Sequence, residues 1–300
     1  MSDVASRLDV LKTYKLYVGG KFPRSESGRV YEVTDAKGAF VANAPLGTRK
    51  DTRDAVLAAR AAVKGWSGTT AYNRGQVLYR VAEMLQGRRE QFAAEVAAAE
   101  GIGGKKAAAL VEAAIDRWVW YAGWTDKVAQ IAGGSNPVAG PYFNLSTPEP
   151  SGVIGIVAPQ NGYGHSLLGL VSVIAPVIAT GNTVVVAAAA DAPLPALSFG
   201  EVLATSDLPG GVVNIISGRT ADIAPTLASH QDVNGLDLSG AIDSDGPGAA
   251  ATLEAAAADT LKRVVRPAAD PAALDWTNAP GTDRLLSFLE IKTVWHPMGI

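Results

Sequence analysis

The stretch from Pro150 to Ala190 contains no Asp, Glu, Lys or Arg, and this uncharged run constrains the fold more than any other feature of the chain. A run of this kind is buried either in a protein core or in a membrane. Pro159, Pro176 and the Gly181-Asn182 pair interrupt it, so no continuous apolar segment approaches the ~20 residues that span a bilayer. We therefore predict that the run forms the core of an α/β domain.

Strand-like and helix-like segments alternate within this run and beyond it. The strand-like segments are apolar without polar alternation, which indicates burial on both faces, and the helices between them indicate right-handed crossovers to a parallel sheet. We expect strands at residues 152–158, 183–186, 212–216, 234–239 and 261–265, and helices at 166–179, 194–205, 222–229 and 248–259. The sequence predicts a Rossmann-like, doubly wound parallel sheet.

The preceding part of the chain is predicted to supply a hairpin and helices. Gly19-Gly20 lies between two alternating segments, which is a hairpin signal. Apolar positions at helical spacing predict helices beginning near Asp51 and Asn73, followed by helices over 88–99 and 107–132. The tryptophans of the last helix suggest either a stacking surface or packing in a core or subunit interface, and we favour packing; they are Trp118, Trp120 and Trp124.

Composition and charge exclude several function classes. The chain has no cysteine, which excludes disulfides, thiolate metal sites and thiol nucleophiles. The net charge of −3 and pI near 5.7 argue against a nucleic-acid partner. The first residues lack the pattern of a secretory signal, so we expect a cytoplasmic protein without a membrane association. The three histidines are scattered, and no metal site is expected; they are His165, His230 and His296.

Three ordered blocks resemble the cofactor-binding domain of the aldehyde dehydrogenase superfamily. These blocks are residues 152–159 (GVIGIVAP), 174–186 (IAPVIATGNTVVV) and 208–218 (LPGGVVNIISG). The tail at 283–295 resembles the family's C-terminal oligomerisation strand. The family's catalytic domain, expected between Val265 and Asp283, is absent. The chain is therefore identified as a truncated, non-catalytic member that resembles the second, cysteine-less module of two-module aldehyde dehydrogenases.

The resemblance implies a division of the chain into four parts. Residues 1–136 form the N-terminal hairpin and helices of the cofactor-domain-like module, and residues 137–150 form a β-arm for oligomerisation. Residues 151–266 form the Rossmann-like core. Residues 267–300 form a linker, with prolines at 267, 271 and 280, and the C-terminal oligomerisation strand.

The resemblance also implies a chemistry, whose residues are mostly missing. In the family a cysteine thiolate attacks the aldehyde, a hydride passes to NAD(P), a glutamate activates water, and a side-chain amide holds the oxyanion. This chain has no cysteine, and Pro267-Ala-Ala-Asp270 stands where the family has its glutamate. Asn161 is the remnant of the oxyanion-stabilising asparagine, and asparagine before glycine is also ordinary turn chemistry.

The cofactor-binding positions have changed as well. Where the family grips the adenosine ribose with Lys and Glu, this chain has Ala187 and Ala190; Asp191, one place on, is a weak substitute candidate. Where the family's Phe-Thr-Gly-Ser faces the pyrophosphate, the sequence reads Leu-Ser-Gly-Ala at residues 238–241. Ser239 and Gly240 are weak cofactor-binding candidates, whereas Ala241 lacks the family's serine hydroxyl. Asp243 and Asp245 follow this segment. No cofactor is expected, with NAD as the alternative.

Two functions of different classes remain open. The first is a non-catalytic subunit that assembles with, and stabilises or regulates, a catalytic aldehyde dehydrogenase paralogue, with a homodimer as the alternative assembly. The second is a component that binds NAD(H) for an aldehyde dehydrogenase complex. An unrelated hydrolytic site would need Ser166 or Ser239 to lie beside a histidine and an acidic residue. The sequence shows no histidine and acid at positions that would serve either serine.

Overall fold

The computed structural model describes residues 10–241, 246 and 248–299. Its centre is a parallel sheet of five strands in the order β7-β6-β5-β8-β9. The strands are β5 Val153–Val157, β6 Thr183–Ala187, β7 Val213–Ile216, β8 Gly235–Asp237 and β9 Arg263–Val265. Every residue of β5, β6 and β7 is buried, as predicted for strands covered on both faces. The doubly wound fold predicted from the sequence is confirmed.

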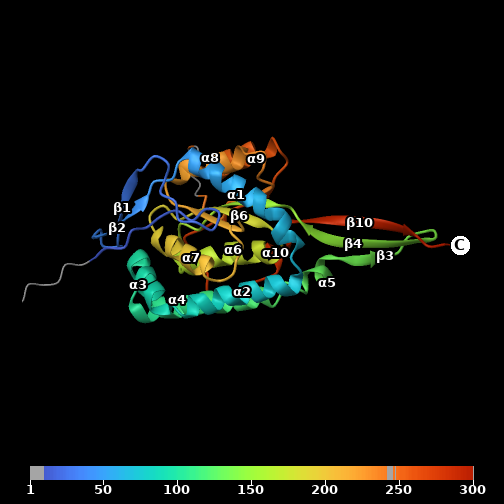
Figure 1. The fold of residues 1–300 in the computed structure, drawn as a ribbon, viewed down its shortest axis with the longest axis horizontal. Coiled ribbons are helices and arrows are strands. Elements are labelled where there is room, and N and C mark those ends of the chain that lie inside the picture. Colours follow the sequence, from blue (N-terminus) through green and yellow to red (C-terminus); the bar gives the residue numbers. More distant parts are fainter. Residues whose placement is uncertain (1–9, 242–245, 247, 300) are drawn as a thin grey trace, which may run out of the picture.

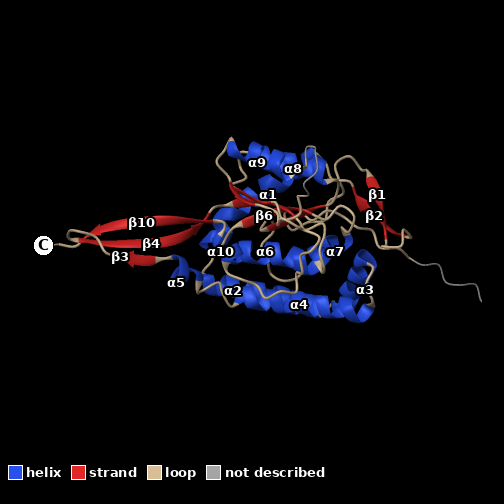
Figure 2. Cartoon of the chain, turned by 180° about the vertical axis from the view of Figure 1, so that it is seen from behind, coloured by secondary structure: helices blue, strands red, loops and turns tan. Residues whose placement is uncertain are grey.

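Helices cover both faces of this sheet (Figures 1 and 2). One face is covered by α1 Arg49–Gly68, α8 Thr220–Ser229 and α9 Ala250–Ala258. The other is covered by α6 Leu170–Ala179, which follows a π-helical turn at His165–Gly169, and by α7 Leu194–Ala204. An outer layer of α2 Ala71–Gln86, α3 Arg89–Glu100 and α4 Gly104–Ala122 packs on this second face.

The tryptophan and hairpin predictions have clear outcomes. Trp118 is fully buried and its ring stacks on Phe199 with centroids 5.7 Å apart, so this tryptophan is a core residue. The Gly19-Gly20 turn forms with both glycines at positive φ, although only isolated bridges flank it. A two-stranded antiparallel sheet follows this turn, formed by β1 Val30–Thr34 and β2 Phe40–Pro45.

The predicted helix over 107–132 is wrong as a single element. It divides into α4 and the short α5 Val128–Ala132, with a turn between them. In that turn the buried Thr125 hydroxyl donates to the Ala122 carbonyl oxygen at 3.0 Å and packs over Gly75 of α2. A threonine hydroxyl that bonds to a preceding carbonyl competes with the helix ladder. The helix therefore breaks where a side chain is needed against α2.

An antiparallel arm of three strands extends away from this body (Figures 1 and 2). Its strand order is β10-β4-β3, with β3 Gly134–Asn136, β4 Tyr142–Pro150 and β10 Leu289–Pro297. β10 pairs with β4 along their whole lengths, from Leu289 opposite Pro150 to Pro297 opposite Tyr142. The predicted arm and C-terminal strand thus form one sheet. The division of the chain at residues 136, 150 and 266 stays a prediction.

The C-terminal segment is fixed to the parallel sheet by a buried ion pair. Arg284, on the short α10 Asp283–Leu286, binds the carboxylate of Asp237 at the end of β8, and Asp237 is 1% exposed. The amide of Asn182 also donates to the Phe288 carbonyl oxygen at 3.0 Å. Within the described residues, no helix has the length and apolar character needed to cross a membrane.

We expect Arg284→Ala to lower the free energy of unfolding by about 3 kcal/mol, because it leaves the buried Asp237 carboxylate without its cationic partner. The matched control is Arg263→Ala, which removes an exposed pair with Glu290 and should cost less than about 1 kcal/mol. Urea unfolding monitored by tryptophan fluorescence measures both values. Equal losses in the two variants would contradict the importance of the buried pair.

Candidate functional site

The strand order reverses between β5 and β8, and ligands of open parallel sheets bind beyond the carboxyl ends of the strands at such a point. The loop after β5 carries Asn161, and the segment after β8 carries Ser239 and Gly240. Asn161 is exposed, whereas Ser239 and Gly240 are buried. Asn161, Ser239 and Gly240 thus follow the two strands that flank the reversal, although Ser239 was expected at the end of a longer strand over 234–239. Whether their polar groups are free to bind depends on their partners.

Gly240 is committed to backbone packing. Its amide donates to the Val157 carbonyl oxygen at 3.0 Å. A Cβ atom at this position would lie 1.7 Å from the Ala158 carbonyl oxygen, so only glycine fits. The two loops at the strand reversal are thus in direct contact at Gly240, and its N–H is not available to an anion.

Ser239 is equally engaged. Its hydroxyl donates to the Asp237 carboxylate and accepts a hydrogen bond of 2.9 Å from Arg284. Ala241, next along the chain, is buried and offers no hydroxyl. Asp243 and Asp245, which follow this segment in the sequence, lie outside the described residues. This segment therefore holds α10 in place and offers no free side-chain donor at residues 239–241.

Gln160 joins the loops that follow β5 and β6, a role that sequence reasoning missed. Its side-chain nitrogen donates to the Ala158 carbonyl oxygen at 2.7 Å, and its side-chain oxygen accepts from the Ala190 amide at 2.9 Å. Between these loops, Ala187 is buried and presents only a methyl group. Of the two positions that bind the ribose in the family, Ala187 thus offers only a methyl group, and the backbone amide of Ala190 is already bonded to Gln160.

Asp191 is exposed and lies beside Tyr31. Burial, and secondarily the charge of Asp191, raises the pKa of the Tyr31 hydroxyl, which donates to the Ala190 carbonyl oxygen at 3.1 Å. Asp191 also lines an apolar cavity of about 210 Å³ between β1, β2, α3 and the start of α7. The structure therefore places this candidate beside the β1–β2 sheet.

The segment that follows β9 packs against the loop of Asn161. Tyr163 exchanges two backbone hydrogen bonds with it, donating to the Leu274 carbonyl oxygen at 2.9 Å and accepting from the Trp276 amide at 3.1 Å. The Trp276 ring is 9% exposed and lies against Gly169. The buried Arg117 of α4 donates to the Trp276 carbonyl oxygen at 3.0 Å. The chain thus covers this side of the loop with its own backbone.

Glu100, at the end of α3, fills the position where an anion could meet the start of α6. Its carboxylate accepts from the amides of Gly164 and Ser166, at 2.9 and 3.0 Å, and from the Ser166 hydroxyl at 2.6 Å. The side chain is 4% exposed. A carboxylate is stabilised by the partial positive charge of a helix N-terminus. Sequence reasoning missed Glu100 because it lies far from Ser166 along the chain.

The same contacts argue against a hydrolytic site at Ser166. The Ser166 hydroxyl bonds to Glu100, and Nδ1 of the neighbouring His165 lies 3.0 Å from the Gly162 carbonyl oxygen. A serine nucleophile needs its hydroxyl bonded to a base that can take the proton. His165 closes a turn here and does not contact the serine hydroxyl in any hydrogen bond of the described residues.

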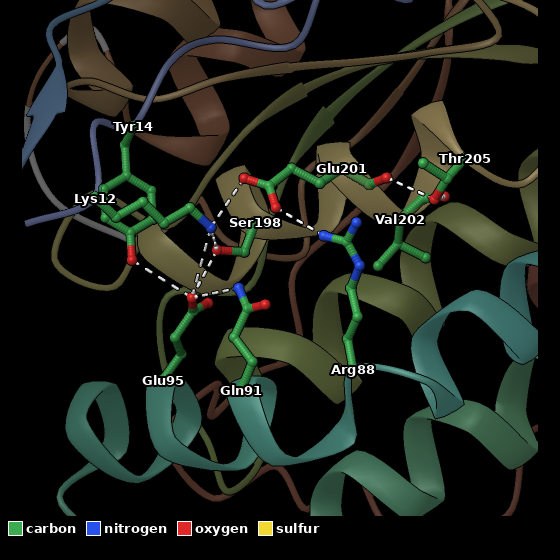
Figure 3. A network of polar contacts seen from close by, with 9 residues as sticks. All are labelled: Lys12, Tyr14, Arg88, Gln91, Glu95, Ser198, Glu201, Val202 and Thr205. Carbon is green, nitrogen blue, oxygen red and sulfur yellow. Dashed lines mark hydrogen bonds and ion pairs between the residues drawn. The ribbon is translucent and has the colours of Figure 1, made fainter.

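A second polar cluster joins the N-terminal segment to α3 and α7 (Figure 3). Lys12 donates to the Ser198 hydroxyl at 2.8 Å, and Ser198 donates to Glu95 at 2.7 Å. Burial raises the pKa of the Glu95 carboxyl. A lysine beside a serine can activate it as a nucleophile, but Ser198 is fully buried and no substrate can reach it. Glu201 extends the cluster by pairing with Lys12 and Arg88, at 2.9 and 2.7 Å, so the cluster is structural.

No three His, Asp or Glu side chains gather into a potential metal site in the part of the chain that the structure describes. His230 immediately follows α8, and its ring accepts a hydrogen bond from the Asp232 amide at 3.1 Å. The candidate site therefore contains one exposed amide side chain, Asn161, on a loop whose neighbours are bonded to the protein itself.

Comparison with known proteins gives consistent matches. The profile described as "Aldehyde dehydrogenase family" matches residues 22–266. Cytosolic 10-formyltetrahydrofolate dehydrogenase of Mus musculus is 32% identical over 245 residues, covering 79% of this chain and 26% of that protein. Retinal dehydrogenase 2 of Gallus gallus is 33% identical over 259 residues, covering 85% of this chain and 48% of that protein.

Solved structures agree with these matches. An aldehyde dehydrogenase from Bacillus cereus in complex with NAD+ superposes with a TM-score of 0.78 and 25% identity, over 84% of this chain and 50% of that chain. A putative aldehyde dehydrogenase from Burkholderia cenocepacia gives a TM-score of 0.77 and 29% identity, over 83% of this chain and 51% of that chain. This chain spans about half, or less, of the length of these relatives.

We expect NAD and NADP to bind weakly or not at all, because Ala187 lacks a polar group and Ser239 and Gly240 are bonded within the protein. Each lost polar contact weakens binding by about 1–3 kcal/mol. Isothermal titration calorimetry with NAD should show no saturable heat at millimolar ligand. A micromolar dissociation constant that Asp191→Ala weakens would contradict this and favour NAD(H) binding.

Proposed function

Since the chain belongs to the aldehyde dehydrogenase family, we propose that it is a non-catalytic subunit that assembles with a catalytic member of that family. The observation that carries this proposal is the contrast between two regions. Apart from the exposed Asn161 and Asp191, the polar groups of the candidate site are absent or bonded within the protein, whereas the arm exposes apolar side chains on both of its faces. A chain that keeps an interface and lacks a catalytic site fits an assembly role.

The chemistry of the site supports a non-catalytic role. With no cysteine in the sequence, a thiolate cannot attack an aldehyde. Only 17 residues separate Val265, the end of β9, from Asp283, the start of α10 (residues 266–282), too few for a catalytic domain. These residues pack on the body through Trp276 and Arg117. The protein has thus replaced the expected domain by a short crossing segment.

The arm has the composition of an interface. Paired side chains of β4 and β10 share a face, so Leu145 and Val294 lie together on one side and Pro148 and Ile291 on the other. Beyond the buried Leu289 at its base, the arm has six large apolar side chains that are more than one-third exposed; they are Tyr142, Phe143, Leu145, Ile291, Val294 and Trp295. An apolar sheet of this kind is an aggregation hazard unless another chain covers it.

A homodimer would cover the arm equally well and remains the alternative assembly. A hetero-oligomer is favoured because it joins this chain to a subunit that carries the missing nucleophile. In that assembly the chain stabilises or regulates its partner, in the cytoplasm. The second candidate function is NAD(H) binding for a partner, and it depends on Asp191. The Asp191 side chain is exposed beside the β1–β2 sheet. It directly follows Ala190, one of the two positions that bind the ribose in the family.

The purified chain is expected to oxidise no aldehyde, because the reaction has lost its nucleophile and its base. Removing such groups lowers kcat by several orders of magnitude. The assay is NADH formation with a panel of aliphatic and aromatic aldehydes. Turnover that remains with the protein through successive purification steps would show that the chain is an enzyme.

Assembly is tested by co-expression with catalytic aldehyde dehydrogenases from the same source, followed by affinity purification. We expect a catalytic partner to co-purify with the wild-type chain and to be largely lost with Trp295→Ser, because buried aromatic side chains anchor interfaces. The matched control is Tyr79→Ser on α2, since Tyr79 and Trp295 are both 56% exposed. Elution of the wild-type chain alone beside every candidate, as a monomer or homodimer, would refute the hetero-oligomer.

A further inference from the structure

A groove of about 570 Å³ lies on the sheet face covered by α1 and α8, and neither the family match nor the proposed function uses it. Its walls are the turn before β1, the connection from β2 to α1, and the outer side of α8. Ser27, Gly47 and Pro225 mark these three walls. The volume is within the range of small-molecule sites.

Positive charge converges on this groove from all three walls. Arg29 comes from the turn before β1, Arg49 is the first residue of α1, and Arg219 immediately precedes α8. Arg219 pairs with Asp222, also in the lining, at 3.1 Å. Within the described residues, neither Arg29 nor Arg49 has a carboxylate within ion-pair distance. The lining itself therefore carries three guanidinium groups and one carboxylate, while the carboxylates of Glu26 and Asp51 reach its edge by bonding to Thr48.

A threonine hydroxyl provides independent support. Thr226 lines the groove and is 8% exposed. Its hydroxyl has no hydrogen-bond partner among the described residues, and the oxygen is not among their fully buried unpaired polar atoms, so it is open to the groove. Threonine hydroxyls in helices commonly bond to the preceding turn, and that bond is not formed here. A ligand in the groove would provide the missing partner.

The two helix N-termini at the groove differ in how they are capped. At α1, Asp51 and Thr48 form a capping box, so a carboxylate already meets that helix end. At α8, a helix of ten residues, no side chain caps the N-terminus. The partial positive charge of the α8 N-terminus therefore adds to the field of the arginines.

We propose that this groove binds a small organic phosphate. Guanidinium groups bind phosphate oxygens through paired hydrogen bonds, and the Thr226 hydroxyl adds a neutral donor. The size of the groove suits a phosphate monoester with an attached sugar or nucleoside. The site lies on the outer side of α8, whereas the candidate cofactor site lies beyond β5 and β8, so the two are separate. This inference does not depend on the proposed assembly.

The experiment is calorimetric titration of the full chain with AMP and with ribose 5-phosphate. Adenosine tests the need for the phosphate, and citrate tests whether any polyanion suffices. We expect saturable binding of at least one phosphate ester and none of adenosine or citrate. Arg49→Ala and Arg219→Ala should each weaken binding by about fivefold or more, since about 1 kcal/mol per contact corresponds to that factor.

Two further variants make the test specific. Thr226→Val keeps the shape of the side chain and removes its hydroxyl, and it should also weaken binding. Arg89→Ala removes an exposed arginine of α3, outside the groove, and should leave the dissociation constant unchanged. Circular dichroism confirms that each variant is folded.

Three outcomes would overturn the proposal. The first is no saturable binding of either phosphate ester at millimolar concentration. The second is citrate binding as tightly as the esters, which would indicate a non-specific positive surface. The third is binding that Gln160→Ala abolishes and that Arg49→Ala and Arg219→Ala leave unchanged, which would place the ligand at the candidate cofactor site.

Discussion

Burial of the uncharged run on both faces of the sheet is the constraint on which the rest of the structure depends. Strands β5 and β6 have no exposed face, so helices must cover both sides, and the connections between parallel strands supply those helices. The outer helices α2 and α4 in turn cover α6, which is itself entirely buried. The sheet thus needs α6 to cover one of its faces, and α6 in turn needs α2 and α4 to cover its outer side.

The elements that could be predicted from the sequence are those whose signal is local. Apolar strands with breaks such as Gly181-Asn182 located the central sheet, and the capping box at Thr48 and Asp51 marks where α1 begins. The break between α4 and α5 could not be predicted, because it depends on Thr125 packing against Gly75 of another helix. Local periodicity carries no information about such a contact.

The candidate site shows the same limit at the level of single side chains. Ser239 and Gly240 were weak candidates from the sequence, but the groups that bond to them, Arg284 and the Val157 carbonyl, come from segments distant along the chain. Gln160 and Glu100 were missed for the same reason, since each acts by bonding to a remote backbone amide. The residue type at a position predicts what a group could bind, and the fold decides whether that group is free.

The pairing of β4 with β10 has a consequence for how the protein is made. The two strands are far apart in the sequence, and the whole parallel sheet is synthesised between them. During translation, β4 emerges early and must wait for β10, with its edge open while the core domain folds. The arm is therefore completed only after the whole parallel sheet has been synthesised, so the surface that β4 and β10 share forms late, behind a core that can already have folded.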